Sequence, residues 1–185
     1  MRGRRWAAAL VAALAMLGVV PVVSAAATTG KAKPRVTNIE RRATAVVRRV
    51  ESISGDVATK ETPKEIEVTL AADVLFAFNS ADLAPDAAAK VDELARQLEA
   101  DGKGPVHVVG YTDSKGTDAY NQDLSTRRAT SVRDALAAKA GGFTYTVEGK
   151  GAGEPVAPNE KPDGSDNPDG RARNRRVTIT FARKG

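Results

Sequence analysis

The chain has 185 residues, a length that suits one folded domain with a terminal extension. It contains one histidine and no cysteine, which excludes disulfide scaffolds, thiolate metal sites, cysteine nucleophiles and a lipid-modified N-terminal cysteine. The net charge is +5, but residues 51–185 carry 18 basic and 22 acidic residues, a net charge of −4. The excess of basic residues therefore lies near the N-terminus, and the folded part lacks the basic character typical of a nucleic-acid-binding domain.

Residues 1–25 have the pattern of an export signal. The first five residues include three arginines and no acid, residues 6–23 form an almost unbroken apolar run, and Val23-Ser24-Ala25 is a small-residue cleavage site. We expect cleavage after Ala25; the alternative is an uncleaved membrane anchor, because an apolar run of about 18 residues is near the lower limit for crossing a bilayer. In both cases we expect the rest of the chain outside the cytoplasmic membrane, in the cell wall or periplasm, associated with the outer membrane, or extracellular.

Two segments precede the main domain. Residues 26–44 are small, polar and basic, and we expect them to form a flexible segment. Residues 45–64 are expected to form a strand or hairpin extension, although a thin apolar stripe over residues 36–50 also fits a helix. The favoured arrangement is a hairpin made of residues 45–53 and 64–70, with two turn signals between them.

A helix is predicted after a short apolar run at residues 74–78 and a polar loop. It begins at Pro85, a residue favoured in the first turn of a helix, and ends at Gly102. The residues that recur on its apolar face are Ala88, Val91, Leu94, Ala95 and Leu98.

The second half of the chain continues the alternation of strands and helices. The predicted elements are a buried strand at residues 106–109, a helix at 119–139, a strand at 143–148, a long loop at 149–174 and a strand at 175–181. The order strand–helix–strand–helix–strand–strand predicts an α+β fold with two layers, in which helices pack on a mixed parallel and antiparallel sheet. We expect the last two strands to pair antiparallel with each other.

One charged residue lies on the apolar face of the second predicted helix. Arg128 is four residues after Leu124 and four before Val132, so it points toward the packed side, whereas Arg127 points to solvent. A buried arginine needs compensation for its lost hydration. The candidate partner is Asp113, which follows the strand at residues 106–109, where α/β folds place ligand crevices.

Two interpretations of Asp113 and Arg128 remain open at this point. They form an internal salt bridge that fixes the helix to the sheet, or they are held apart to bind a ligand. A carboxylate and a guanidinium held apart complement the ammonium and carboxylate of an amino-acid zwitterion, and arginine binds a carboxylate with two parallel hydrogen bonds.

Several separated motifs resemble the OmpA-like peptidoglycan-binding domain family. The resemblance covers about residues 65–182, and the motifs agree with the family in order and spacing. They are Val74-Leu75-Phe76-Ala77-Phe78-Asn79 with Leu83, Gly110-Tyr111-Thr112-Asp113-Ser114-Lys115-Gly116, Tyr120-Asn121, Leu124-Ser125, Arg127-Arg128-Ala129 with Val132, Gly151-Ala152-Gly153-Glu154-Pro155, Gly170-Arg171 and Asn174-Arg175-Arg176-Val177. Position 111 is a tyrosine where many members of the family have histidine.

The resemblance implies non-covalent binding of peptidoglycan without catalysis. In the family, the positions that correspond to Asp113 and Arg128 hold the meso-diaminopimelate of the peptide stem. Family contacts also correspond to Asn79, Asn121 and Arg175. For the two asparagines the alternative role is capping of a turn or a helix. The partner implied is therefore the diaminopimelate stem peptide of peptidoglycan, with no cofactor.

Several other sequence features do not indicate a functional site. His107 lies in a predicted strand and is interpreted as structural. Asp163, Asp166 and Asp169 lack the spacing of a calcium loop, and no metal site is expected. The residues before the domain are too few for an integral membrane barrel. The alternative function is a protein-interaction module of the cell envelope, in which Asp113 and Arg128 form a structural ion pair.

Overall fold

The computed structural model describes residues 47–52 and 55–185. The chain divides into two units, residues 1–41 and residues 42–185, and the second unit contains all the described residues. The predicted export signal and the whole of the predicted flexible basic segment, residues 26–44, lie outside the described residues. So do the two residues Ile53 and Ser54.

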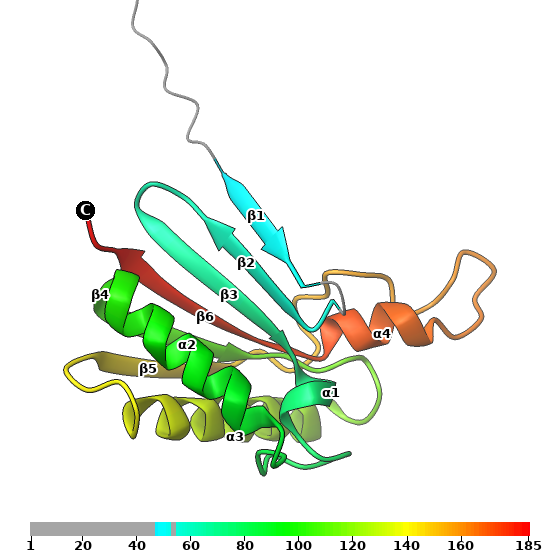
Figure 1. The fold of residues 1–185 in the computed structure, drawn as a ribbon. Helices are drawn as coiled ribbons and strands as arrows, with labels where there is room; N and C mark the ends of the chain where they lie inside the picture. The colour runs from blue at the N-terminus through cyan, green and yellow to red at the C-terminus, as the bar shows by residue number, and fades with distance from the viewer. Residues whose placement is uncertain (1–46, 53–54) are drawn as a thin grey trace, which may run out of the picture. The chain divides into compact units, whose positions relative to one another are not determined.

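A six-stranded mixed sheet forms one layer of the second unit (Figure 1). Its strands are β1 (Arg48–Glu51), β2 (Val57–Glu61), β3 (Glu65–Ala71), β4 (Gly102–Gly110), β5 (Thr144–Gly149) and β6 (Arg176–Arg183), in the spatial order β1-β2-β3-β6-β4-β5. Strands β4 and β5 are parallel, and all other neighbours are antiparallel. The α+β class and the mixed sheet predicted from the sequence are confirmed.

Two long helices, α2 (Ala87–Asp101) and α3 (Asp118–Ala137), form the second layer. Their apolar residues share one core with the strands of the sheet. One row of that core crosses three strands, because Phe181 in β6 is opposite Ile66 in β3 and Val106 in β4, and all three side chains are buried. The alternation along β6 predicted from the sequence is confirmed, since Val177, Ile179 and Phe181 are buried and the intervening threonines are half-buried.

The N-terminal extension differs from its predicted pairing. Residues 45–53 were expected opposite residues 64–70, but β2 lies between β1 and β3 and pairs with both. The two turn signals each form a separate turn. Ser52 accepts a hydrogen bond from Val57 N (3.1 Å) at the first turn, and Thr62 accepts one from Glu65 N (2.9 Å) at the second. Strand β2 is half-buried and polar, so it lacks the apolar alternation that marked β3.

The position of the last strand is also different from the prediction. Strand β6 does not pair with β5; it lies between β3 and β4, and β5 occupies the edge of the sheet. The reason is burial. The apolar side chains of β6 are fully buried in the centre of the sheet, whereas β5 exposes Thr144, Thr146 and Glu148, which suits an edge strand.

Two short helices were not predicted. Helix α1 (Ala72–Leu75) is a single turn within the apolar run before the polar loop, and α4 (Pro168–Asn174) lies inside the predicted loop at residues 149–174. Helix α4 has Asn167 as its N-cap, whose side chain accepts a hydrogen bond from Gly170 N (3.2 Å). In α2, the buried position is Ala87 and not the predicted Ala88, which is exposed.

Candidate functional site

A cavity of about 460 Å³ lies beside the end of β4, between α1, α3 and α4. Its lining comes from α1 and the loop after it, from the turn between β4 and α3, from α3, and from α4 with the residue after it. The lining residues are Asp73, Phe76, Ala77, Phe78, Asn79, Thr112, Asp113, Lys115, Tyr120, Asn121, Leu124, Arg128, Arg171 and Arg175. All five residues predicted for the site are therefore brought together at one cavity.

A close contact between the main chains of β4 and α3 fixes the position of this cavity. Gly110, the last residue of β4, lies so near α3 that a Cβ atom there would be 2.1 Å from the main-chain oxygen of Ser125. The Ser125 hydroxyl accepts a hydrogen bond from Gly151 N (2.9 Å), which holds the loop after β5 against the same turn. Asp113 follows Gly110 by three residues, and Arg128 lies nearly one helical turn after Ser125. The contact at Gly110 thus places both charged residues at the same end of the sheet.

Asp113 is held by donors on both carboxylate oxygens. It is 7% exposed; Oδ1 accepts a hydrogen bond from Lys115 N (3.0 Å), and Oδ2 accepts from Arg175 Nη1 (2.7 Å) and Arg171 Nη1 (3.3 Å). Burial alone raises the pKa of this carboxyl, but the hydrogen bonds from Arg175, the Lys115 amide and Arg171 outweigh it and lower the pKa below its ordinary value. Asp113 is therefore an ionised, fixed acceptor.

Arg128 is buried without a carboxylate partner. It is 5% exposed, and within the described residues it takes part in no ion pair. Its Nε donates a hydrogen bond to the main-chain oxygen of Ser80 (2.9 Å), and its Cζ lies 5.2 Å from the centre of the Phe76 ring. Burial lowers the pKa of the guanidinium, but an arginine stays charged at neutral pH. Its terminal nitrogens have no hydrogen-bond partner in the described part of the chain.

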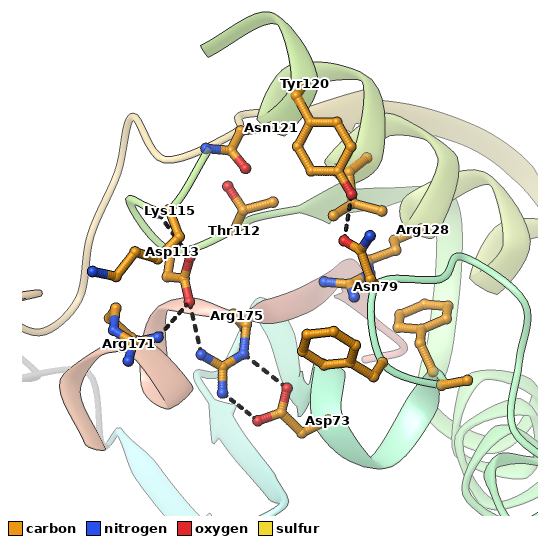
Figure 2. A pocket seen from close by; sticks show the side chains of 14 residues that line it. Asp73, Asn79, Thr112, Asp113, Lys115, Tyr120, Asn121, Arg128, Arg171 and Arg175 are labelled. Carbon is orange, nitrogen blue, oxygen red and sulfur yellow. Dashed lines mark hydrogen bonds and ion pairs between the residues drawn. The ribbon is translucent and has the colours of Figure 1, made fainter. Parts of the chain in front are cut away.

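The internal salt bridge between Asp113 and Arg128 that the sequence left open is not formed. Asp113 pairs with Arg175 and Arg171, and Arg128 is compensated by Ser80 and Phe76. Figure 2 shows Asp113 beside Arg171 and Arg175, with Arg128 across the cavity next to Asn79. The two charges therefore line one cavity and are not paired with each other.

Arg175 bridges two acids from its place between α4 and β6. Its Nε and Nη2 donate to the carboxylate of Asp73 (2.8 and 2.5 Å), and its Nη1 donates to Asp113. The hydrogen bonds from Arg175 to Asp73 are the main reason that its pKa is raised above the ordinary value. The sequence placed Arg175 at the start of the predicted strand at residues 175–181, but Arg175 precedes β6, and the end of α4 positions it at the cavity.

The two predicted asparagines have different surroundings. Asn79 has a φ of 55°, a turn conformation that asparagine tolerates, and its side-chain oxygen accepts a hydrogen bond from the Tyr120 hydroxyl. Asn121 is 3% exposed, and its amide has no hydrogen-bond partner among the described residues. It does not cap α3, because the N-cap is Thr117, which accepts from Tyr120 N (3.2 Å). The nearby Thr112 hydroxyl is also buried without a partner.

Several charged residues of the site were not predicted from the sequence. Asp73 and Arg171 neighbour the predicted residues in space but lie 40 or more positions from Asp113 in the chain, and only Arg171 belongs to a quoted motif. Arg171 also forms two hydrogen bonds with Asp166 (2.9 and 2.6 Å). The cavity is lined by the cations Lys115, Arg128, Arg171 and Arg175 and by the anions Asp73 and Asp113. These groups leave an excess of two positive charges, which favours an anionic ligand.

Other predictions fall outside the cavity. His107 is not in the core; it is exposed on the sheet face away from the helices, where its Nδ1 is 2.7 Å from the Thr146 hydroxyl. Asp166 of the acidic loop is engaged by Arg171 and Lys115. Among the described residues there is no group of three or more side chains suited to hold a metal ion. In the same part of the chain, none of the helices has the length and apolar character needed to cross a membrane.

Comparison with known proteins decides the family. The OmpA family matches residues 75–175, which is more than half of the chain. The chain belongs to the OmpA family. It is 41% identical over 129 residues to the photosystem I P700 chlorophyll a apoprotein A2 of Gloeobacter violaceus, which covers 69% of this chain but only 15% of that protein.

Two further relatives share more of their length with this member of the OmpA family. Outer membrane protein A of Bordetella avium is 41% identical over 122 residues, covering 65% of this chain and 59% of that protein. The solved structure of the cell wall anchor of the T6SS from Pseudomonas aeruginosa is 35% identical, with a TM-score of 0.62 over 71% of this chain and 90% of that one. The chain thus spans less than two thirds of both curated relatives, but nearly all of the solved cell wall anchor structure.

Proposed function

We propose that this OmpA-family domain binds cell-wall peptidoglycan non-covalently through the meso-diaminopimelate of the stem peptide, and so links an exported protein to the wall. The observation that carries the proposal is that Asp113 and Arg128 line one cavity and are not paired with each other. A relative of similar length and fold is a cell wall anchor. The outer membrane protein A relative also belongs to the envelope.

The chemistry of the ligand follows from the two charges. The free end of diaminopimelate carries an ammonium and a carboxylate on one carbon. The unengaged edge of the Arg128 guanidinium suits the carboxylate, which it can hold with two parallel hydrogen bonds. Asp113 suits the ammonium, because Oδ1 accepts only one main-chain hydrogen bond and keeps room for another donor.

The neutral and cationic groups around this pair support the same ligand. The unpartnered amide of Asn121 offers both a donor and an acceptor. Arg175 and Arg171 keep Asp113 ionised and in place, and they also leave the cavity with its excess of positive charge. A stem peptide is rich in carboxylates and meets that excess.

The alternative function is a protein-interaction module of the cell envelope in which Asp113 and Arg128 form a structural ion pair. That pair is absent among the described residues, where Asp113 pairs with Arg171 and Arg175. An enzyme of the serine-nucleophile type also finds no support in the site. The Ser125 hydroxyl is buried, donates to the main-chain oxygen of Gln122 (2.9 Å) and accepts from Gly151 N, so no base is positioned beside it.

Sedimentation of the purified protein with diaminopimelate-type sacculi tests the proposal. Asp113→Ala and Arg128→Ala each remove a charge-assisted contact worth about 1.5–3 kcal/mol, so each should weaken binding roughly tenfold to a hundredfold. Arg127→Ala is the matched control, because Arg127 is the neighbouring exposed arginine and pairs only with Asp123 on its own helix. Unchanged binding by both folded cavity variants would exclude the site.

Competition with soluble stem peptides tests the diaminopimelate assignment separately. A peptide with lysine in place of diaminopimelate keeps the ammonium but lacks the carboxylate for Arg128, and it should compete far less well. A peptide with the amidated carboxylate should have an intermediate effect, because one acceptor survives but the charge does not. Equal competition by the lysine and diaminopimelate peptides would contradict the zwitterion mechanism even if sacculi are bound.

A further inference from the structure

Phe78 is fully exposed although it lines the cavity. It belongs to the loop between Phe76 and Leu83, which are joined by an isolated β-bridge. Because this aromatic ring stays in contact with water, it contributes no hydrophobic stabilisation to the folded protein. A single such ring is common on protein surfaces, so its meaning depends on what holds it and what surrounds it.

The loop that carries Phe78 is fixed at the residues that directly follow the ring. The next residue, Asn79, accepts a hydrogen bond from the Tyr120 hydroxyl, and Ser80 accepts one from Arg128 Nε (2.9 Å). Ser80 is held further through its hydroxyl, which donates to Asp82 (3.0 Å) and accepts from Asp82 N (2.8 Å). The loop is therefore anchored to α3 through the side chain of Asn79 and the main chain of Ser80, while the ring of Phe78 stays fully exposed.

Aromatic residues are concentrated at this cavity. They make up only 4% of the chain, yet Phe76, Phe78 and Tyr120 all line it. Phe76 is buried beneath the Arg128 guanidinium, whereas Tyr120 is partly exposed and Phe78 is fully exposed. Asp113 and Arg128 are thus buried in the interior of the site, and the two accessible rings lie at its mouth.

We infer that Phe78, with Tyr120 beside it, forms a second subsite that packs against the sugar ring of the glycan to which the bound stem peptide is attached. This inference rests on the proposed function. Rings that flank a polar pocket recognise ligands with one apolar face and polar edges, and the C–H face of an N-acetylhexosamine has that character. Diaminopimelate is the third residue of the stem, so only two residues, about 7 Å of extended chain, and the lactyl link separate it from the sugar. The glycan must therefore lie just outside the mouth of the cavity.

Two soluble ligands separate this subsite from the charged one. The first is the free diaminopimelate stem peptide, and the second is the same peptide on its disaccharide. Wild-type protein should bind the disaccharide ligand more tightly. Phe78→Ala should weaken binding of the disaccharide ligand by about threefold to tenfold more than it weakens binding of the free peptide, a typical loss for one aromatic contact. Phe78→Trp should keep the difference between the ligands.

The control is Val156→Ala, since Val156 is another exposed apolar residue, 62% exposed, that does not line the cavity. It should change neither affinity. Calorimetry with each ligand gives the affinities, and thermal unfolding should show that all three variants are as stable as the wild type. If Phe78→Ala weakens both ligands equally, the ring contacts the peptide and not the sugar, which overturns the inference. If it changes neither, the subsite does not exist. Failure of the wild type to bind even the free peptide would instead overturn the proposed function.

Discussion

Among the described residues, two arginines are buried without a carboxylate partner, Arg128 and Arg176, and they differ in what surrounds their donors. Arg176, at the start of β6, stacks on Tyr111 with its Cζ 3.6 Å from the ring centre. Its terminal nitrogens donate to the main-chain oxygens of Asn174 (3.2 Å) and Glu154 (3.0 Å). Arg128 has a more distant ring and one hydrogen bond, through Nε. Burial lowers the pKa of both guanidiniums.

The difference teaches that burial of an arginine does not by itself indicate a binding site. Arg176 donates hydrogen bonds to the loop at Glu154 and to the end of α4, so it has a structural role: it connects these two segments. Arg128 has the same degree of burial but retains unengaged donors that face a cavity. The number of satisfied donors, and not the exposed fraction, separates the structural arginine from the candidate ligand-binding one.

The largest effect is expected from removing the structural arginine. Arg176→Ala removes the stacking on Tyr111 and leaves two main-chain oxygens without their donor, which should lower the free energy of unfolding by about 2–4 kcal/mol. Urea unfolding measures this loss. Folded Arg176→Ala protein should still bind sacculi like the wild type; a stable variant with weakened binding would place Arg176 in the site and break the comparison.

The second prediction concerns Arg128, for which we expect little change in stability and a large loss of sacculus binding. Arg128→Met keeps most of the side-chain volume and removes a buried charge, so the free energy of unfolding should stay within about 1 kcal/mol of the wild type or rise. Sacculus binding should fall at least tenfold. Thermal unfolding and sedimentation of the same sample test both statements. A large loss of stability would show that Arg128 has a structural role of the same kind as Arg176.

A smaller effect is expected from acid. The pKa of Asp113 is lowered in the folded protein, so its contribution to stability is present above the ordinary carboxyl pKa, near 3.9, and is lost as the pH falls through the folded value. Asp113→Asn should therefore flatten the dependence of stability on pH below about pH 4 relative to the wild type. Asp163→Asn is a suitable comparison, because the pKa of Asp163 is also lowered but its partner is Ser165 in an exposed loop, away from the cavity. Identical acid unfolding curves for the wild type and Asp113→Asn would contradict the prediction.

The sequence predicted the parts of the site that depend on local pattern. Arg128 was identified because helical spacing placed it on an apolar stripe, and Asp113 because it follows a buried strand; both are buried at one cavity. The family resemblance added Asn79, Asn121 and Arg175. The partners of Asp113 could not be derived in this way, because Arg171 and Arg175 lie 58 and 62 residues further along the chain. Arg171 belongs to α4, which lies in a stretch rich in proline and glycine, and Arg175 directly follows that helix.

The errors in the fold have the same origin. Helical and strand periodicity show which residues are buried, but not which strands become neighbours. The alternation of Val177, Ile179 and Phe181 correctly predicted β6, but its place between β3 and β4 depends on pairings between distant residues, from Gly110 with Val177 (67 positions apart) to Glu65 with Ala182 (117 positions apart). Strand β2 escaped prediction because its half-buried residues lack an apolar alternation.

The central place of β6 has a consequence for how the domain comes to fold. The strand that joins β3 to β4 is the last one in the chain, so neither neighbour has its full set of main-chain partners until residues 176–183 have been made. Contacts between such distant segments form slowly, because the chain entropy lost in closing the intervening loop precedes the gain from pairing. The inner edges of β3 and β4 therefore stay unpaired in a growing chain until residues 176–183 can reach them.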